Sequence, residues 1–483
     1  MKKDLKKDLE AKIAAITPVD EAFSTLPYEA KKPRMAFGRA GKWAFGGSLV
    51  AGVAVLGLTI LALAPGADVP FEDDSQLSFP TYRSRMEINH GIPAYDTFVE
   101  RFVPVLFESF DRSASVSVSL PDLFVALALS AYLSGGAIES EFLSYVGLES
   151  EDELLTSCSD IFRMLGNLDE DGEPPSGGLL LSSLFLDPLY KLRDDEEMGV
   201  LLEKVADAFG TAIFYRSPSD SVLNAYLRSV APRGASVPTI DLDDTLDCVV
   251  ASTYIGNFFY HPEEAFRYKS SYDAGSRMPY CFGEVEKNVP YIRSTLTNSP
   301  YLGSLAGSEV PFEGIGLGVG NLANLYCFKT LDEKESPFAL ISDILGRNYE
   351  EKYSTVALDE ETFFGYYLTV KVPYFKDETN VNFTSTLLGE MPSFGNEDAF
   401  LNKILAPESP KATFKVAAQQ LQLNYDYMGF TVASLTYVGG ATSTMPSPVK
   451  KDLFFDRPFA YVLYESGRHE LPIVVGCIVD PAY

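Results

Sequence analysis

Residues 424–448 read NYDYMGFTVASLTYVGGATSTMPSP and form the most informative stretch of the chain. Its middle part, FTVASLTYV at 430–438, is rich in β-branched and aromatic residues, which predicts a strand. The pair Gly439-Gly440 adds backbone freedom, and two prolines follow at 446 and 448. The segments on either side of this stretch indicate what kind of protein carries it.

The chain changes in character from helical to β-rich along its length. Helical periodicity marks 97–110, 121–136 and 196–210, and the pair Gly135-Gly136 predicts the end of the second helix. The later segments 363–376, 458–465 and 471–479 read as strands. Helices followed by strands, with no internal repeat, predict an α+β fold with large mixed β-sheets.

The composition indicates a large globular core and an acidic surface. Hydrophobic residues make up 46% of the 483 residues, and 33 Phe and 27 Tyr supply bulky core side chains. The formal net charge of −28 argues against nucleic acid or an anionic lipid surface as a partner. We therefore expect no nucleic-acid binding.

The cysteines and histidines predict neither a metal nor a cofactor. The five cysteines are an odd number without CxxC spacing, so a zinc site or a disulfide framework is not expected. The three histidines form no HExxH motif. His261 within His-Pro-Glu-Glu is better explained as a surface turn than as a metal or acid/base cluster.

An uncharged run at 43–64, WAFGGSLVAGVAVLGLTILALA, predicts a transmembrane helix. Its 22 residues give roughly 33 Å of helix, enough to cross a bilayer core. Basic residues precede the run and acidic residues follow it, which places the N-terminus in the cytoplasm and the rest outside. The predicted location is therefore the cell membrane, with a single pass.

Two other interpretations of this run remain open. Ala62-Leu63-Ala64 resembles a signal-peptide cleavage site, but the 42 preceding residues are far longer than a normal n-region, and Pro65 would follow the cut. A buried core helix is the third possibility. With an uncleaved anchor, the expected organisation is a cytoplasmic head at 1–42, the span at 43–64, an extracellular stalk at 65–92 and one large domain at 93–483.

Five segments of the large domain, in the same order, resemble the serpin family. The C-terminal one contains Asp456-Arg457-Pro458-Phe459, where serpins usually have Asp-His-Pro-Phe. The chain is similar to a membrane-anchored, bacterial-type member of that family. The resemblance covers nearly all of 93–483 and rests on residues 114–148, 221–238, 247–266, 368–394 and 456–481.

The resemblance implies that 424–448 holds the exposed reactive loop of a serpin. Gly429 matches the hinge glycine, and Met445-Pro446-Ser447-Pro448 matches a common Met-Pro-x-Pro. Counting by the family spacing puts the protease-sensitive bond between Ser443 and Thr444. The residues implied for the hinge and the loop are Gly429, Phe430, Thr431, Val432, Ala433, Ser434, Leu435, Thr436, Gly439, Gly440, Ala441, Thr442 and Met445.

A serpin is a protease substrate whose cleaved loop inserts as a new strand into its main sheet, so no catalytic residue of its own is implied. Alternate residues of that strand, 430, 432, 434 and 436 by the family register, would face the buried side. Phe430 departs from the small residue that is usual there, and it could slow insertion or fill a cavity. The early Ser119-Leu120-Pro121-Asp122 also departs from the family's Ser-Pro order.

These features predict a membrane-tethered, monomeric inhibitor of a serine or cysteine endopeptidase. Ala441, Thr442 and Ser443 are small and uncharged, which favours an elastase-like or subtilisin-like target. The alternative is a non-inhibitory serpin-fold module for binding or sensing at the cell surface. An enzyme is not expected, because a G-x-S-x-G elbow is absent and GIGLGVGN at 314–321 does not satisfy the GxGxxG motif.

Overall fold

The structure is a computed structural model, and all of its described residues lie in one compact unit, Val69–Tyr483. The predicted head at 1–42 and the predicted span at 43–64 lie outside the described residues. No helix in the described ranges is both long and apolar enough to cross a bilayer. The described residues are 76–78, 91–165, 177–231, 242, 245–259, 275–283, 285–297, 301–304, 310–319, 323–345, 353–355, 366–396, 399–426, 429–431, 449–465 and 471–481.

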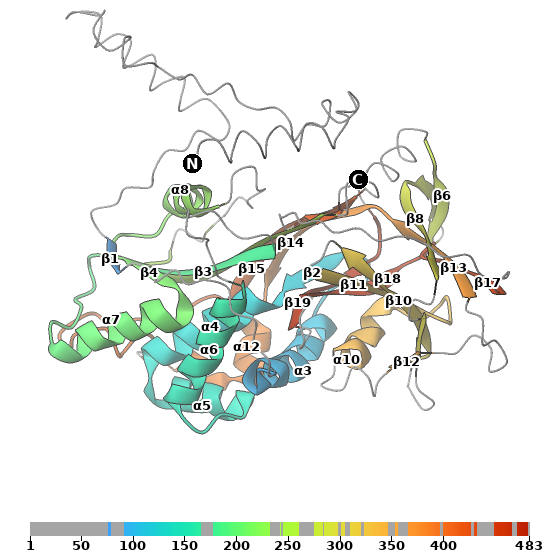
Figure 1. The fold of residues 1–483 in the computed structure, drawn as a ribbon. Coiled ribbons are helices and arrows are strands. Elements are labelled where there is room, and N and C mark those ends of the chain that lie inside the picture. The colour runs from blue at the N-terminus through green and yellow to red at the C-terminus, as the bar shows by residue number, and fades with distance from the viewer. Residues whose placement is uncertain are drawn as a thin grey trace, which may run out of the picture. The chain divides into compact units, whose positions relative to one another are not determined.

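The first half of the domain is mainly helical, as predicted. Figure 1 shows α4 to α7 on one face of a long sheet, with α8 on the opposite face. The main helices are α3 (Pro93–Glu108), α4 (Leu120–Ser134), α5 (Gly136–Val146), α6 (Glu151–Leu165), α7 (Glu196–Phe209) and α8 (Asp220–Val230). Shorter helices are η4 (Pro337–Leu340), α10 (Ile341–Ile344), α12 (Thr384–Glu390) and η5 (Pro392–Gly395).

Local sequence signals explain where these helices begin and end. The side chains of Asp195 and Ser219 accept hydrogen bonds from the first turns of α7 and α8, as N-cap residues do. Helix α4 ends at Gly135, whose φ of 68° is open to glycine, so the predicted end at Gly135-Gly136 is confirmed. Because α4 is buried on nearly all sides, its sequence is apolar except for Asp122, Ser130 and Ser134.

The strands form a main sheet, a second sheet, a third sheet and a hairpin. The main sheet has the order β1 (Gln76–Ser78), β4 (Thr211–Phe214), β3 (Gly177–Leu186), β5 (Cys248–Phe259), β16 (Gly429–Thr431), β15 (Ala418–Asp426) and β14 (Phe375–Asn382). The second sheet has the order β12 (Tyr353–Thr355), β9 (Tyr301–Ser304), β10 (Phe312–Val319), β11 (Ala323–Thr330), β18 (Phe459–Glu465), β19 (Leu471–Ile478) and β2 (Val116–Ser119). The third sheet has the order β17 (Val449–Phe454), β13 (Tyr366–Pro373) and β8 (Tyr291–Thr297), and the hairpin joins β6 (Met278–Phe282) to β7 (Val285–Val289).

The predicted strands at 363–376, 458–465 and 471–479 are confirmed as β13 with the start of β14, as β18 and as β19. Of the predicted strand at 430–438, the structure describes only the first two residues, within β16. Strand β1 falls inside the segment predicted as a stalk and pairs with β4.

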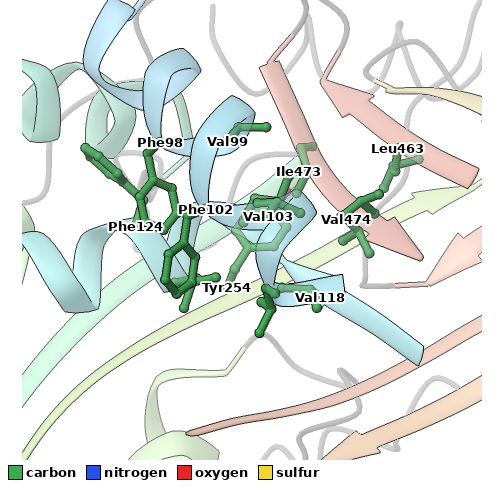
Figure 2. Packing of buried hydrophobic residues seen from close by; sticks show 14 of the residues in the cluster. Phe98, Val99, Phe102, Val103, Val118, Phe124, Tyr254, Leu463, Ile473 and Val474 are labelled. Carbon is green, nitrogen blue, oxygen red and sulfur yellow. The ribbon is translucent and has the colours of Figure 1, made fainter. Parts of the chain in front are cut away.

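One large core joins the helices to the main and second sheets. In Figure 2, Phe98 and Phe102 of α3 lie beside Phe124 of α4, with Ile473 of β19 and Leu463 of β18 close by. The rings of Phe98 and Phe124 meet edge to face, with centroids 5.4 Å apart. A smaller cluster lies between α8 and the opposite face of the main sheet and consists of Phe185, Ala212, Phe214, Val222, Leu223, Tyr226 and Leu227.

The glycines of β10 have a packing role. Gly314 stands opposite Phe328 of β11, and Gly316 stands opposite Tyr326. A Cβ atom on Gly314 would lie 2.7 Å from the Phe328 ring, and one on Gly316 would lie 2.8 Å from the Tyr326 ring. The glycines leave room for these two rings within the strand.

Candidate functional site

The N-terminal end of the predicted loop lies inside the main sheet. After β15 the chain forms β16, which is antiparallel to both β15 and β5. Phe430 stands opposite Phe258 of β5 and Tyr425 of β15. Directly opposed residues of antiparallel strands share a face, and Phe258 and Tyr425 are both buried in the main core. Position 430 therefore belongs to the row that faces the core.

Only the hinge of the predicted loop falls among the described residues. Gly429, Phe430 and Thr431 make up β16. Residues 432–448, with the predicted bond Ser443–Thr444, lie outside the described residues. The other predicted positions outside them are Val432, Ala433, Ser434, Leu435, Thr436, Gly439, Gly440, Ala441, Thr442 and Met445.

Beyond the three residues of β16, β5 and β15 are not paired with each other by backbone hydrogen bonds. Among the described strands, β16 is the one that joins β5 to β15. In β5, Cys248–Gly256 extends past β16, and in β15 the corresponding part is Ala418–Leu423. Continuing β16 in the same register through residue 440 would reach Cys248 at the far end of β5. The main sheet is therefore arranged so that β16 can lengthen as a central strand.

The first position along this path is covered by two aromatic rings. Gly256 is the residue of β5 that position 432 would oppose. A Cβ atom on Gly256 would lie 2.9 Å from the Tyr254 Oη and 3.0 Å from the Phe258 ring. The rings of Tyr254 and Phe258 thus fill the space above Gly256 on the core side, and a glycine is required between them.

The C-terminal end of the loop is anchored in the third sheet. Strand β17 runs parallel to β13, with residues 449–454 opposite residues 366–371. The N–H of Phe455 donates to the Lys371 carbonyl at 2.9 Å, and the Lys371 ammonium lies 4.1 Å from the centre of the Phe454 ring. Backbone pairing and a cation–π contact therefore both hold the end of β17.

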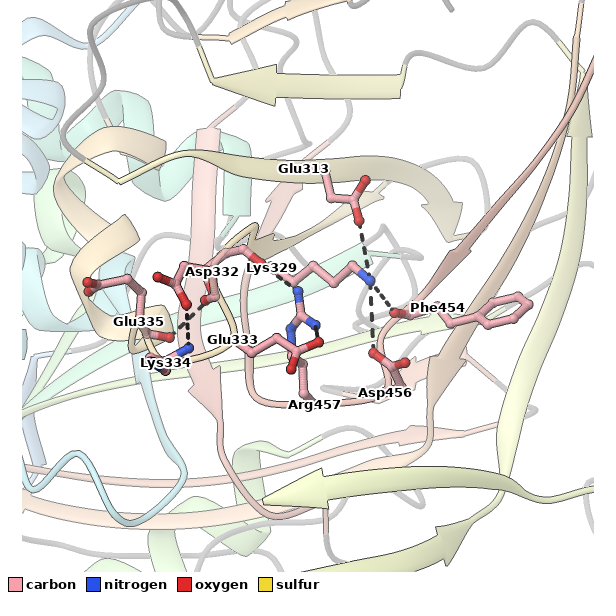
Figure 3. A network of polar contacts seen from close by, with 10 residues as sticks. Glu313, Lys329, Asp332, Glu333, Lys334, Glu335, Phe454, Asp456 and Arg457 are labelled. Atoms are coloured by element: carbon pink, nitrogen blue, oxygen red, sulfur yellow. Dashed lines mark hydrogen bonds and ion pairs between the residues drawn. The ribbon is translucent and has the colours of Figure 1, made fainter. Parts of the chain in front are cut away.

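Two basic side chains fix the chain at the last residue of β17 and shortly after it, as Figure 3 shows. The ammonium of Lys329, on β11, donates to the Phe454 carbonyl at 2.7 Å and pairs with Glu313 at 3.3 Å. The Lys329 side chain is only 10% exposed, so this contact is shielded from water. Arg457 donates to the Thr330 carbonyl at 2.8 Å and to Glu333 at 2.9 Å. The second and third sheets are thus joined at the distal end of the loop.

No protein-family model and no curated protein matches the chain, but solved structures do. The thermophilic serpin tengpin in its native state superposes with a TM-score of 0.59 and 14% identity, over 83% of this chain and 97% of tengpin. Human thyroxine-binding globulin gives 0.58 and 14%, over 81% of this chain and 100% of the globulin. Mouse protein-Z dependent protease inhibitor gives 0.57 and 13%, over 81% of this chain and 96% of the inhibitor. The fold is that of a serpin.

The serpin fold confirms the architecture implied by the resemblance, and the likeness lies in the fold rather than in the sequence. None of the three proteins is named as an enzyme. Within the described ranges, no group of three or more His, Cys, Asp and Glu side chains is placed to hold a metal ion. All five cysteines are free thiols, and burial raises the pKa of Cys158, Cys327 and Cys477.

The serpin-like fold also contains a buried group of polar side chains between β2, α4 and β15. We call Ser119, Asp122 and Gln419 the polar junction. Ser119 ends β2, Asp122 lies in the first turn of α4, and Gln419 belongs to β15. The Gln419 amide donates to the Ser119 carbonyl at 2.7 Å and to the Asp122 carboxylate at 3.2 Å. The Ser119 hydroxyl donates to the other Asp122 oxygen.

A second buried carboxylate ties β14 to the same strand, β2. Asp377 accepts hydrogen bonds from the hydroxyls of Ser117 at 2.5 Å and Thr379 at 2.8 Å. The N–H groups of Ser117 and Ser119 donate to Thr379 and Gln419 at 3.0 and 2.9 Å. Strand β2 is an edge of the second sheet, so these bonds satisfy edge donors that no strand pairs.

Sequence reasoning missed Lys329 and Lys371, which hold the distal end of the loop, and Gln419, which joins β15 to β2 and α4. A signal existed for Lys329, because it is a lysine at the end of the apolar strand pattern ANLYCFKT. Asp122 had been noted as a departure from the serpin pattern, but not as a buried partner of β15.

Proposed function

We propose that this serpin-fold chain inhibits a serine or cysteine endopeptidase by inserting its cleaved loop between β5 and β15. The observation that carries the proposal is the position of β16, which already lies between these strands while β17 is still paired with β13. A loop held at both ends is what the protease would meet, and a sheet that can receive a strand is what would trap it.

The lengths of the strands support cleavage near Ser443–Thr444. In the register of β16, residues 429–440 match the whole of β5 from Phe259 to Cys248. Ala441, Thr442 and Ser443 would extend beyond Cys248. An acyl-linked protease would therefore be carried about 40 Å, the length of a 12-residue strand, to the far end of the sheet.

The register of β16 also supports the residues that the resemblance places on the buried side of the inserted strand, at positions 430, 432, 434 and 436. Position 430 lies in the buried row, so 432, 434 and 436 follow in that row if the strand lengthens. Their partners in β5 would be Gly256, Tyr254 and Ser252. These are the positions at which the chain carries Val, Ser and Thr, which are small or β-branched side chains.

The test is to incubate the full chain with an elastase-like or subtilisin-like protease and analyse the mixture by denaturing electrophoresis. We expect an SDS-stable complex and a released fragment whose N-terminus is Thr444 or a close neighbour. Cleaved chain should also unfold at a higher temperature than intact chain. Complete cleavage with neither a complex nor a rise in unfolding temperature would overturn the proposal.

We propose further that residues 43–64 anchor the chain in the cell membrane with the serpin domain outside and residues 1–42 in the cytoplasm. Its support is the uncharged 22-residue run and the basic residues before it. The chain should remain with membranes after alkaline extraction, and external protease should reach the serpin domain in intact cells. A deletion of 43–64 should release the chain, and release without that deletion would contradict the anchor.

The second candidate function is a non-inhibitory binding module, and two observations favour it. Thyroxine-binding globulin, one of the similar structures, was solved in complex with thyroxine. The row that loop insertion would extend is crowded, because the rings of Tyr254 and Phe258 fill the space over Gly256. Cleavage without a complex in the experiment above is the result that this function predicts.

A further inference from the structure

Strand β1 joins the main sheet at the end opposite to the hinge. Gln76 of β1 pairs with Phe214 of β4. Through Phe185 of β3, the same row of residues reaches Val249 of β5. The hinge strand β16 pairs with the other end of β5, at Phe259. At about 3.3 Å per residue, roughly 33 Å of β5 separates these two rows.

The direction of β1 shows from which side the chain enters the sheet. Strand β4 is parallel to β3, and both run toward the end that carries β1. Strand β1 is antiparallel to β4, with Gln76 opposite Phe214 and Ser78 opposite Ile213. Gln76 is therefore the outermost residue of β1, and the chain enters the strand from beyond Phe214, on the side away from the hinge.

The surface at this end is built from the loops that follow β3 and β4. We call residues 187–193 and 215–217 the far pole. The Tyr215 hydroxyl donates to the Tyr190 carbonyl at 2.5 Å, and the Ser217 hydroxyl donates to the Asp187 carboxylate. The Asp187 N–H donates to the carbonyl of Asp247, just before β5, at 2.9 Å. These bonds connect the ends of three strands, so the far pole is a fixed surface.

The predicted loop begins and ends at the opposite end of the domain. Strand β13, which holds β17, leads directly into β14 at Phe375, and Phe375 pairs with Tyr425 in the row of the hinge. From there β14 runs toward the far pole, so β13 and β17 lie on the other side of the hinge. Figure 1 shows this separation, with β1 at the left of the fold and β17 at the right.

The proposed insertion would bring the cleaved end of the loop to the far pole. In the register of β16, Gly439 would stand opposite Val249, so Ser443 would lie beyond the end of β5. The nucleophilic oxygen or sulfur of the protease bonds to the Ser443 carbonyl carbon, the Ser443–Thr444 peptide bond breaks, and the new amine of Thr444 takes the proton. The acylated protease therefore arrives at the end of the domain where β1 enters.

A short tether connects this same end to the proposed membrane span. Only eleven residues, 65–75, separate the span at 43–64 from Gln76. A fully extended chain covers about 3.5 Å per residue, so Gln76 lies no more than roughly 40 Å from the end of the span. A protease of about 220 residues has a radius of gyration of about 17 Å and is thus about 45 Å across. The reach of the tether and the size of the protease are comparable.

We propose that the serpin-fold domain hangs from the membrane by its far pole, so that the uncut loop faces away from the lipid and trapping carries the protease into the space between the far pole and the bilayer. This inference rests on the proposed strand insertion and the proposed anchor, and it assigns the surface that faces the membrane. The net charge of −28 disfavours contact with anionic lipid, so the tether sets the width of that space.

The first test compares two fluorescent thiol labels on the full chain in phosphatidylcholine vesicles that contain an energy-acceptor lipid. One label is on the native Cys281 of β6, which is exposed and whose N–H donates to the Asp456 carbonyl just after β17. The other is on Leu189→Cys in the far pole, combined with Cys281→Ser. Leu189 is 45% exposed, so its replacement should leave the fold intact.

The label in the far pole should transfer more energy to the lipid than the label on Cys281. Because the two sites differ by about 30 Å or more along the sheet, we expect at least about twofold stronger transfer from position 189. A chain without 43–64 should show only background transfer from either label. Should Leu189→Cys fail to fold, Arg216→Cys, another exposed position of the far pole, takes its place.

The second test follows the protease on the unlabelled chain in the same vesicles. A fluorescent elastase-like or subtilisin-like protease is compared with its own variant in which Ala replaces the nucleophile, which docks on the loop but cannot acylate it. The active protease is carried about 40 Å toward the membrane, so its energy transfer should be at least about twofold that of the inactive variant. The transfer should rise together with the SDS-stable complex.

Each outcome bears on a different part of the argument. Equal transfer from the two chain labels, or stronger transfer from Cys281, would overturn attachment by the far pole. A complex that forms in vesicles without a rise in transfer from the protease would also overturn it, while strand insertion would stand. Background transfer from both chain labels would contradict the anchor and this inference with it. Absence of any complex would count against inhibition, and the two chain labels would still decide the orientation.

Discussion

The two ends of the predicted loop are held in different ways. At the distal end, the six residues of β17 pair with β13, and Lys329 and Lys371 hold the chain at Phe454. At the hinge, three residues of β16 lie between two long strands whose remaining edges are not paired with each other. The distal end is therefore held by side chains as well as by backbone pairing. At the hinge, β16 pairs with only three residues of β5 and three of β15.

Under the proposed insertion, this difference would keep the loop anchored at β17 before cleavage and let it extend from β16 afterwards. Strand β17, which would stay in place in the proposed insertion, is stabilised by contacts from β11 and β13, which lie in two different sheets. Strand β16, which would lengthen in the proposed insertion, would gain ladder bonds toward Cys248. Backbone hydrogen bonds in a central strand are gained on both edges, so cleavage should release a large free energy through the hinge.

The largest effect is expected where the hinge would extend. Ser434→Arg would place a charge in the core-facing row between Tyr254 and Leu421 in the register of β16. An unpaired buried charge costs about 3 kcal/mol or more, so formation of the SDS-stable complex should fall at least about a hundredfold while cleavage continues. Densitometry of complex against cleaved chain measures this ratio.

The matched control is the neighbouring residue on the other side of the strand. Leu435→Arg carries the same charge but would face away from the core, opposite Thr253 and Gln420, which are both partly exposed. It should keep most of the complex. If both variants lose the complex equally, the loop does not enter in the register of β16, and the contrast between hinge and distal end loses its basis.

A smaller effect is expected at the distal end. Lys329→Met removes a charge from a side chain that is 10% exposed and leaves Glu313, which is 16% exposed, without this partner. The free energy of unfolding should fall by about 3 kcal/mol, measured by urea denaturation. With β17 less firmly held, the intact chain should also lose inhibitory capacity faster during storage at 37 °C.

The double variant Lys329→Met with Glu313→Gln shows how much of the stability lost in Lys329→Met comes from leaving the Glu313 charge unpaired. It should recover part of the lost stability, because the carboxylate that remains after Lys329→Met is then also neutral. Equal losses in the single and double variants would mean that the Lys329 hydrogen bond to Phe454 alone accounts for the effect.

The sequence predicted the elements well and their long-range contacts poorly. Strands β18 and β19 were predictable because they are buried throughout and read as continuous apolar runs. The end of α4 was predictable because glycine readily adopts the positive φ that often ends a helix, as Gly135 does here. The register of β16 against β5 could not be predicted in this way, since strand pairing depends on residues far apart in the chain.

The candidate site shows the same division. Resemblance to serpins predicted the hinge at Gly429, where β16 begins, and both this hinge and the bond Ser443–Thr444 stay predictions. Nothing local connects Gln419 with Ser119, which is 300 residues away, or Asp377 with Ser117. Such contacts depend on how the second sheet packs against the main sheet, so they become visible only when both sheets are in place.

The smallest effect is expected at Arg457, which joins the distal end of the loop to β11. Arg457→Met removes the hydrogen bond to the buried Thr330 carbonyl, and the free energy of unfolding should fall by about 1–2 kcal/mol. Glu333→Gln is the control, because Glu333 is 80% exposed and its ion pair with Arg457 is worth about 0.5 kcal/mol or less. Urea denaturation of both variants measures the difference. Equal losses would show that the surface ion pair, and not the bond to β11, fixes the chain after β17, and the distal end would then be held less tightly than its contacts indicate.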